Sequence, residues 1–104
     1  MKVYTFLTDG FETVEALAVI DILRRAGIEV ETVSITGNEQ VCSAQNITVK
    51  ADTLFKAQPV CKEDVLFLPG GPGHKQYNEC KPLLKLLEKH HAEGGRIAAI
   101  CAAP

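Results

Sequence analysis

Apolar and polar residues follow one another in blocks that predict strands and helices in turn. Four short segments are rich in apolar or β-branched side chains, as strands are: residues 2–7, 28–34, 64–68 and 96–100. The last two contain unbroken apolar runs, which is typical of strands buried on both faces of a parallel sheet. The pattern therefore predicts a sheet with at least two fully covered strands.

Two longer segments predict helices between these strands. Residues 11–26 have acidic side chains near their start and Arg24 and Arg25 in the last turn, which suits the helix dipole. Few side chains of this segment are polar, so we expect the helix to be mostly buried. Residues 74–92 predict a second helix, broken before Pro82, because proline suits the first turn of a helix and not its middle.

Shorter features complete the fold prediction. Residues 41–43 and 47–50 predict a short hairpin, and residues 53–57 one helical turn. Alternating strands and helices, with two uniformly apolar strands, predict a doubly wound, mostly parallel α/β sheet with right-handed crossovers. The strand at 97–100 needs cover on both faces, yet Pro104 stands where the next helix would begin. We therefore expect this chain to be one piece of a longer protein.

Composition excludes several classes of function. The 104 residues allow one domain, and the net charge of -2 without a basic run disfavours nucleic-acid binding. No apolar run approaches the roughly 18 residues of a membrane span, and the first residues lack a secretory signal pattern, so we expect a cytoplasmic protein. The 4 cysteines form no Cys-x-x-Cys pair, which disfavours a zinc site and favours free thiols.

Cys101 is the first candidate for chemistry. It follows the apolar strand directly, with small residues at 102 and 103 and Pro104 where a helix would start. This layout is that of a nucleophile elbow, in which a tight turn presents the reactive side chain at the carboxyl end of a sheet. A helix N-terminus there favours the thiolate. A buried structural cysteine at a strand end is the competing interpretation.

The Gly-rich turn of residues 69–73 is the second candidate. It follows a buried strand, so it lies at the edge of the sheet where ligands bind. Its backbone N–H groups, with the N–H after the elbow cysteine, could form an oxyanion hole. A phosphate loop or a plain tight turn remains open, although neither common nucleotide-binding glycine motif is present.

Two glutamates and three histidines are further candidates. Glu12 and Glu15 lie three residues apart on one side of the first helix, and Glu12 is best read as a solvated dipole partner. Glu15 precedes five apolar residues, so it could point inward and, in its neutral form, donate a hydrogen bond to a thiolate. His74 could reach the same edge, whereas His90 and His91 are read as structural or solvated.

Three stretches give the chain a family resemblance: Glu12–Ala16 continuing to Asp21–Gly27, Leu68–Gly71, and Ala98–Pro104. In order and spacing, the chain resembles the N-terminal part of the ThiJ/PfpI superfamily, on its DJ-one, deglycase-like branch. The resemblance implies a flavodoxin-like α/β fold, similar to class I glutamine amidotransferases, that is apparently truncated at the nucleophile elbow. Residues 1–104 would then be the N-terminal part of a single domain, often found as a homodimer.

The resemblance also implies roles for individual residues. Cys101 matches the reactive, readily oxidised elbow cysteine, and Glu15 matches the protonated acid that hydrogen-bonds its thiol. Gly71 and Ala102 match the backbone N–H donors beside them, with Gly70 and His74 as possible substrate contacts. Cys42 matches a second, peripheral cysteine near the dimer contact. No cofactor and no metal are implied.

The family's activities leave the function open. They include glyoxalase III-type conversion of methylglyoxal, deglycation, chaperone and redox-sensor roles, and peptidase activity in the protease-like PfpI branch. The expected substrate is a small reactive carbonyl, with redox sensing and hydrolysis as alternatives. A phospho-accepting receiver domain shares the fold but needs acidic residues where Leu68 and Pro69 stand. The family's histidine partner and last elements would follow Pro104, so we do not expect residues 1–104 alone to be active.

Overall fold

The computed structural model describes residues 1–56 and 58–100. Its elements are, in chain order, β1 (Lys2–Leu7), α1 (Thr13–Arg25), β2 (Glu29–Ser34), β3 (Gln40–Cys42), β4 (Thr48–Lys50), β5 (Thr53–Leu54), β6 (Val65–Leu68), the 3-10 helix η1 (Pro72–His74), α2 (Lys75–Glu79), α3 (Lys81–Ala92) and β7 (Arg96–Ala99). Five strands form a parallel sheet in the order β5-β2-β1-β6-β7, and β3 and β4 pair as an antiparallel hairpin. The expected flavodoxin-like α/β fold is confirmed.

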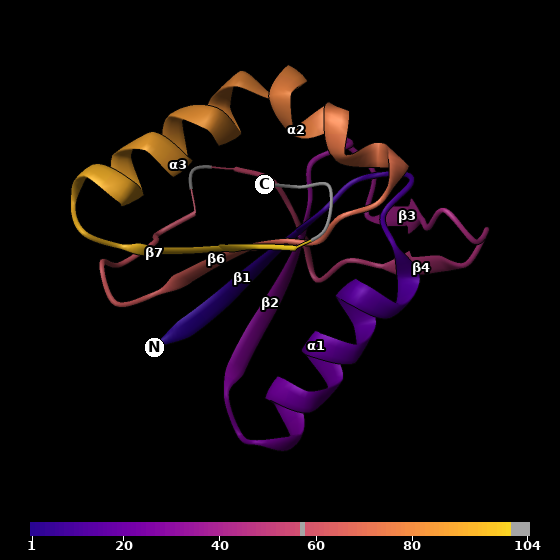
Figure 1. The fold of residues 1–104 in the computed structure, drawn as a ribbon, viewed down its shortest axis with the longest axis horizontal. Coiled ribbons are helices and arrows are strands. Elements are labelled where there is room, and N and C mark those ends of the chain that lie inside the picture. Colours follow the sequence, from indigo (N-terminus) through magenta and orange to yellow (C-terminus); the bar gives the residue numbers. More distant parts are fainter. Residues whose placement is uncertain (57, 101–104) are drawn as a thin grey trace.

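The sheet is covered by helices on both faces (Figure 1). Helix α1 lies on one face and α2 and α3 on the other, as right-handed parallel crossovers require. On the α2 and α3 side, the buried cluster includes Phe6, Leu66 and Tyr77, and on the α1 side it includes Ile20 and Phe67. The predicted break in the second helix is confirmed, because α2 ends at Glu79 and α3 begins at Lys81 with Pro82 in its first turn.

One strand and one helix are less buried than the sequence pattern predicts. Strand β7 is the edge of the sheet and pairs only with β6, so its residues are exposed, Ile97 by 39%. Helix α1 contacts the sheet through one stripe that contains Ala16 and Ile20, and its outer face leaves Val14 and Ile22 70% and 64% exposed. The prediction of a mostly buried α1 was wrong, because an apolar composition does not reveal which faces have a neighbour. Strand β7 lacks a covering neighbour among residues 1–56 and 58–100.

The segment that follows the hairpin also differs from its prediction. Thr53 and Leu54 form β5, paired in parallel with the end of β2, instead of a helical turn. Asp52 explains the extended conformation. Its carboxylate accepts a hydrogen bond from the Thr32 N–H at 2.9 Å, and its own N–H donates to the Thr32 hydroxyl at 2.8 Å. These two bonds fix the chain alongside β2 just before residue 53.

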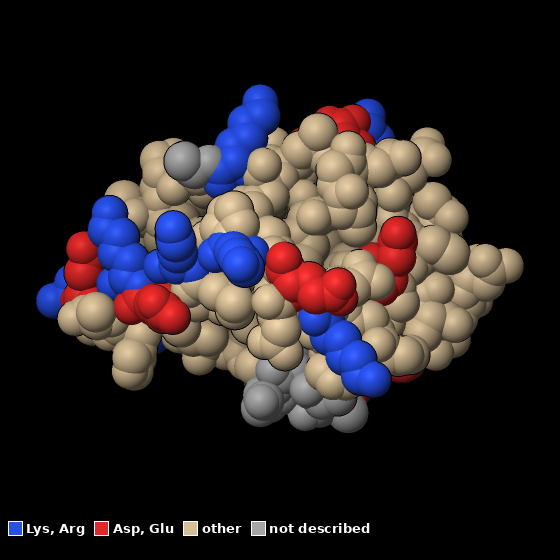
Figure 2. All heavy atoms as spheres, turned by 90° about the horizontal axis from the view of Figure 1, so that it is seen from above, with Lys and Arg blue, Asp and Glu red and all other residues tan. Residues whose placement is uncertain are grey.

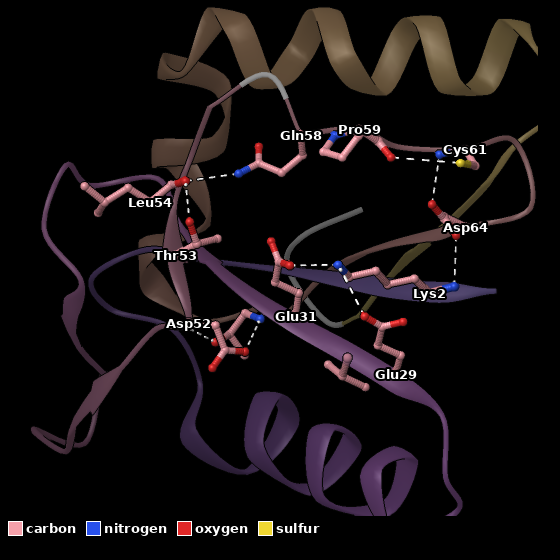
Figure 3. Close-up of polar contacts among 12 residues, drawn as sticks. Lys2, Glu29, Glu31, Asp52, Thr53, Leu54, Gln58, Pro59, Cys61 and Asp64 are labelled. Atoms are coloured by element: carbon pink, nitrogen blue, oxygen red, sulfur yellow. Dashed lines mark hydrogen bonds and ion pairs between the residues drawn. The ribbon is translucent and has the colours of Figure 1, made fainter.

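Polar contacts hold the amino ends of the strands together (Figure 3). The Lys2 ammonium lies between Glu31, at 2.8 Å, and Glu29, at 3.5 Å, and the hydrogen bond to Glu31 raises the pKa of Lys2. The Asp64 carboxylate accepts from the backbone N–H groups of Lys2 and Cys61 at 2.9 and 2.8 Å. These contacts give this end of the sheet a structural role.

The two histidines at the end of α3 differ in their surroundings. His90 is buried and its Nε2 donates to the Asp64 carbonyl at 2.9 Å, whereas His91 is exposed, so the structural interpretation applies to His90.

Across residues 1–56 and 58–100, none of the helices combines the length and hydropathy needed to cross a bilayer.

Candidate functional site

Two loops meet at the carboxyl edge of the sheet because β1 and β6 are neighbours. The loop after β1 spans residues 8–12, and the Gly-rich turn after β6 spans residues 69–73. The Glu12 N–H donates to the Gly70 carbonyl at 2.9 Å, and the Gly73 N–H donates to the Gly10 carbonyl at 3.0 Å. These reciprocal bonds hold both loops in one rigid arrangement next to the start of α1.

Gly71 adopts a backbone conformation that the site depends on. Its φ is 115°, in the region that favours glycine. A Cβ at this position would lie 2.6 Å from both the Gly10 carbonyl oxygen and the Glu12 nitrogen. Position 71 therefore requires glycine, because the two loops approach each other too closely for a side chain to fit between them.

Glu15 lies beside this turn. It is in the first turn of α1, half-buried, and its Oε1 accepts a hydrogen bond from the Gly70 N–H at 3.1 Å. Within the described part of the chain, the next N–H along the turn, that of Gly71, has no hydrogen-bond partner. Three groups therefore lie next to one another: the Glu15 carboxyl, the Gly70 N–H that is hydrogen-bonded to it, and the adjacent Gly71 N–H, which has no partner among the described residues.

The second glutamate points elsewhere. Glu12 caps α1 and is half-buried, and its Oε2 accepts a hydrogen bond from the Gln45 side chain at 3.2 Å. Gln45 belongs to the loop between β3 and β4, so Glu12 connects the helix start to the hairpin. This contact lies at the solvent-exposed surface, and the separate role that the sequence suggests for Glu12 stays a prediction.

His74 turns back onto the Gly-rich turn. Its Nδ1 lies 3.0 Å from the Gly71 carbonyl, and its backbone N–H donates to the same oxygen at 3.0 Å. A carbonyl can only accept, so Nδ1 carries the proton in this contact. His74 thus lies at the predicted edge, where both of these contacts are made to the Gly71 carbonyl.

Tyr77 supports the same turn and was not anticipated from the sequence. Its buried hydroxyl lies 3.0 Å from the Phe6 carbonyl and 3.0 Å from the Pro69 carbonyl, at the ends of β1 and β6. Burial raises the pKa of Tyr77 well above its ordinary value. The one signal in the sequence was a tyrosine within a short polar helix. A tyrosine that is buried there needs a hydrogen-bond partner for its hydroxyl, which could have pointed to this role. Its neighbour Gln76 adds a further link, accepting a hydrogen bond from the Thr8 hydroxyl.

The cysteines are divided between described and undescribed parts of the chain. Cys101 and Ala102 lie outside the described residues. Ile100, the last described residue, donates its N–H to the Leu68 carbonyl at 3.3 Å, directly before Pro69 and the Gly-rich turn. Cys42 is half-buried in β3, with its Sγ 3.4 Å from the Asn46 side-chain oxygen.

Comparison with known proteins identifies the family. The sequence matches the DJ-1/PfpI family over residues 1–104. Protein DJ-1 homolog B of Arabidopsis thaliana is 38% identical over 104 residues, which are 99% of this chain and 24% of that protein. The glutathione-independent glyoxalase DJR-1.2 of Caenorhabditis elegans is 32% identical over 93 residues, covering 89% of this chain and 50% of that protein.

Solved structures agree with the sequence comparison. The oxidised form of Toxoplasma gondii DJ-1 superimposes with a TM-score of 0.91 at 38% identity, covering 99% of this chain and 56% of that one. The chain thus spans a quarter to just over half of the lengths of these relatives. Sequence and fold together place this chain in the DJ-1/PfpI family.

Proposed function

We propose that the protein converts small α-oxoaldehydes such as methylglyoxal, using the Cys101 thiolate and no cofactor. The observation that supports this most directly is the contact of Glu15 with Gly70 beside the open N–H of Gly71. One relative is named a glutathione-independent glyoxalase, which is the same class of reaction. The proposal is made for a full-length protein that includes segments corresponding to those that its relatives carry outside the matched 104 residues.

The chemistry begins with attack of the thiolate on the aldehyde carbon. A carbon–sulfur bond forms as the carbonyl π electrons move to oxygen, and the N–H groups of Gly71 and Ala102 stabilise the resulting oxyanion. The Glu15 carboxyl acts as the general acid and donates a proton from the oxygen that Gly70 does not occupy. The hydrogen on the former aldehyde carbon then moves to the neighbouring carbon through an enediolate, which leaves a thioester on Cys101. Water hydrolyses the carbon–sulfur bond of this thioester, releasing the hydroxy acid and restoring the thiol. Water is therefore the only other reactant, because one carbon is oxidised as its neighbour is reduced.

Comparing Glu15→Gln with Glu12→Gln tests this arrangement. Glutamine keeps the size of the side chain, and its amide can still accept from the Gly70 N–H, but it cannot deliver an acidic proton. We expect kcat for methylglyoxal to fall by at least about 100-fold in Glu15→Gln. Glu12→Gln should stay within about twofold of the wild type, because its carboxylate contacts only the hairpin.

The comparison is made with protein from the complete gene, by following methylglyoxal loss without glutathione. Circular dichroism checks that both variants retain the fold. A Glu15→Gln variant as fast as the wild type would remove Glu15 from the mechanism, and a wild type without turnover would reject the proposed function.

We also propose that the protein is a homodimer through the outer face of α1. Val14, Ala18 and Ile22 lie four residues apart, so they form one stripe, and all three are exposed. Ile47, 49% exposed at the hairpin, adds apolar surface near the start of the same helix. An apolar stripe of this kind is unusual on a surface without a partner.

A charged residue in this stripe should weaken the dimer. Ile22→Glu would bury a carboxylate against apolar surface, so we expect the dissociation constant to rise by about tenfold or more. Analytical ultracentrifugation measures the constant, with Asn78→Glu, an exposed position on α2, as the control for added charge. A monomeric wild type, or a dimer that Ile22→Glu leaves unchanged, would contradict this assignment.

A further inference from the structure

A hollow lies away from the Gly-rich turn. It has a volume of about 530 Å³ and is formed between residues that follow β5 and one side of α3; its lining residues are Phe55, Lys56, Gln58, Pro82, Lys85, Leu86 and Lys89. The volume falls within the range of about 300–1,000 Å³ that small-molecule sites occupy. None of these residues belongs to the site proposed for methylglyoxal.

The floor of this hollow is apolar and firmly held. Phe55 and Leu86 pack against the core cluster on this side of the sheet. The Phe55 ring meets the buried Phe6 ring edge to face, with centroids 6.0 Å apart. A fixed aromatic ring that is partly open to solvent is a favourable surface for an apolar group, since binding removes both surfaces from water.

The rim is cationic. Lys85 and Lys89 are one turn apart on α3, and Lys56 comes from the opposite wall. Among the described lining residues there is no aspartate or glutamate, and none of the ion pairs in the described chain involves these three lysines. Figure 2 shows several Lys and Arg side chains on this face of the molecule, with Asp and Glu side chains between them. The positive charge is therefore local to the lining of the hollow, on a chain whose net charge is -2.

We propose that this hollow binds a small amphipathic anion, with a hydrocarbon body and one carboxylate head. The body would lie on Phe55 and Leu86, and the carboxylate would meet the ammonium groups of Lys56, Lys85 and Lys89. The combination selects against two simpler ligands. A bare phosphate would leave the apolar floor in water, and a neutral hydrocarbon would leave three like charges together.

Calorimetric titration with decanoate tests the proposal. We expect saturable binding to the wild type, weakened by about tenfold or more in the double variant Lys85→Glu/Lys89→Glu, because two attractions become repulsions. The control is Lys75→Glu/Lys81→Glu, which makes the same change of net charge at exposed lysines outside the hollow. It should bind decanoate within about twofold of the wild type.

Any of the following results would overturn the proposal. They are no saturable binding of decanoate at millimolar concentration, equal weakening in both double variants, or equally tight binding of decan-1-ol. Thermal unfolding of each variant confirms that the fold is intact, which is expected because Lys85 and Lys89 are exposed. Tighter binding of inorganic phosphate than of decanoate would likewise reject an amphipathic ligand.

Discussion

Cys101→Ala is expected to abolish methylglyoxal turnover, with kcat falling by at least about a thousandfold. The thiolate is the atom that forms the covalent bond in the proposed reaction, and alanine offers no nucleophile in its place. Glu15 and the Gly71 N–H can stabilise charge on a bound aldehyde, but neither can attack it. The measurement is the rate of methylglyoxal loss with protein from the complete gene.

Cys61→Ala is the matched control, because Cys61 is an exposed free thiol on the opposite, amino-terminal edge of the sheet. It should retain the wild-type rate. Full activity in Cys101→Ala would refute covalent catalysis at this position. Intact mass after mild peroxide separates the redox alternative: a wild type without turnover that gains two oxygen atoms on Cys101 alone would indicate a sensor.

Gly71→Ala is expected to lower the free energy of unfolding by about 3 kcal/mol or more. The added methyl would meet the backbone of Gly10 and Glu12 at 2.6 Å, and backbone atoms of two interlocked loops cannot move aside cheaply. The residue would also hold a φ of 115°, which is strained for alanine. Urea denaturation followed by circular dichroism measures the change.

Gly37→Ala separates the two contributions. Gly37 also has a positive φ, 87°, but a Cβ there would have no heavy atom within 4 Å. Its cost is therefore the backbone strain alone, about 1 kcal/mol. Similar losses in both variants would mean that the loops yield to the methyl group, and that the corner is less rigid than its hydrogen bonds indicate.

Local patterns predicted much of this fold. The first strand, residues 2–7, was predicted with the bounds that it has, because it is a compact apolar run ended by Thr8, Asp9 and Gly10. The break before Pro82 and the antiparallel hairpin were predicted because proline and turn residues act through their own backbone. In each case the deciding interaction joins residues that are close together in the sequence.

Contacts between distant residues account for the rest. The extended form of Thr53 depends on Asp52 bonding to Thr32, some twenty residues away. The exposure of Ile22 and Ile97 depends on which elements lie beside them, and a composition-based argument cannot supply that. For the candidate site, Glu15 contacts Gly70, and the roles assigned to these residues from sequence stay predictions. The contacts of Tyr77 and the Glu12–Gln45 contact emerged only from the structure.

The hydroxyl of Tyr77 carries one hydrogen and faces two carbonyl oxygens, those of Phe6 and Pro69. Its exposed neighbours Lys75 and Asn78 contact solvent. Substitutions that accumulate as orthologous sequences diverge should therefore be tolerated at positions 75 and 78 and selected against at position 77. A lineage that did replace this tyrosine would need a second change to satisfy both strand ends.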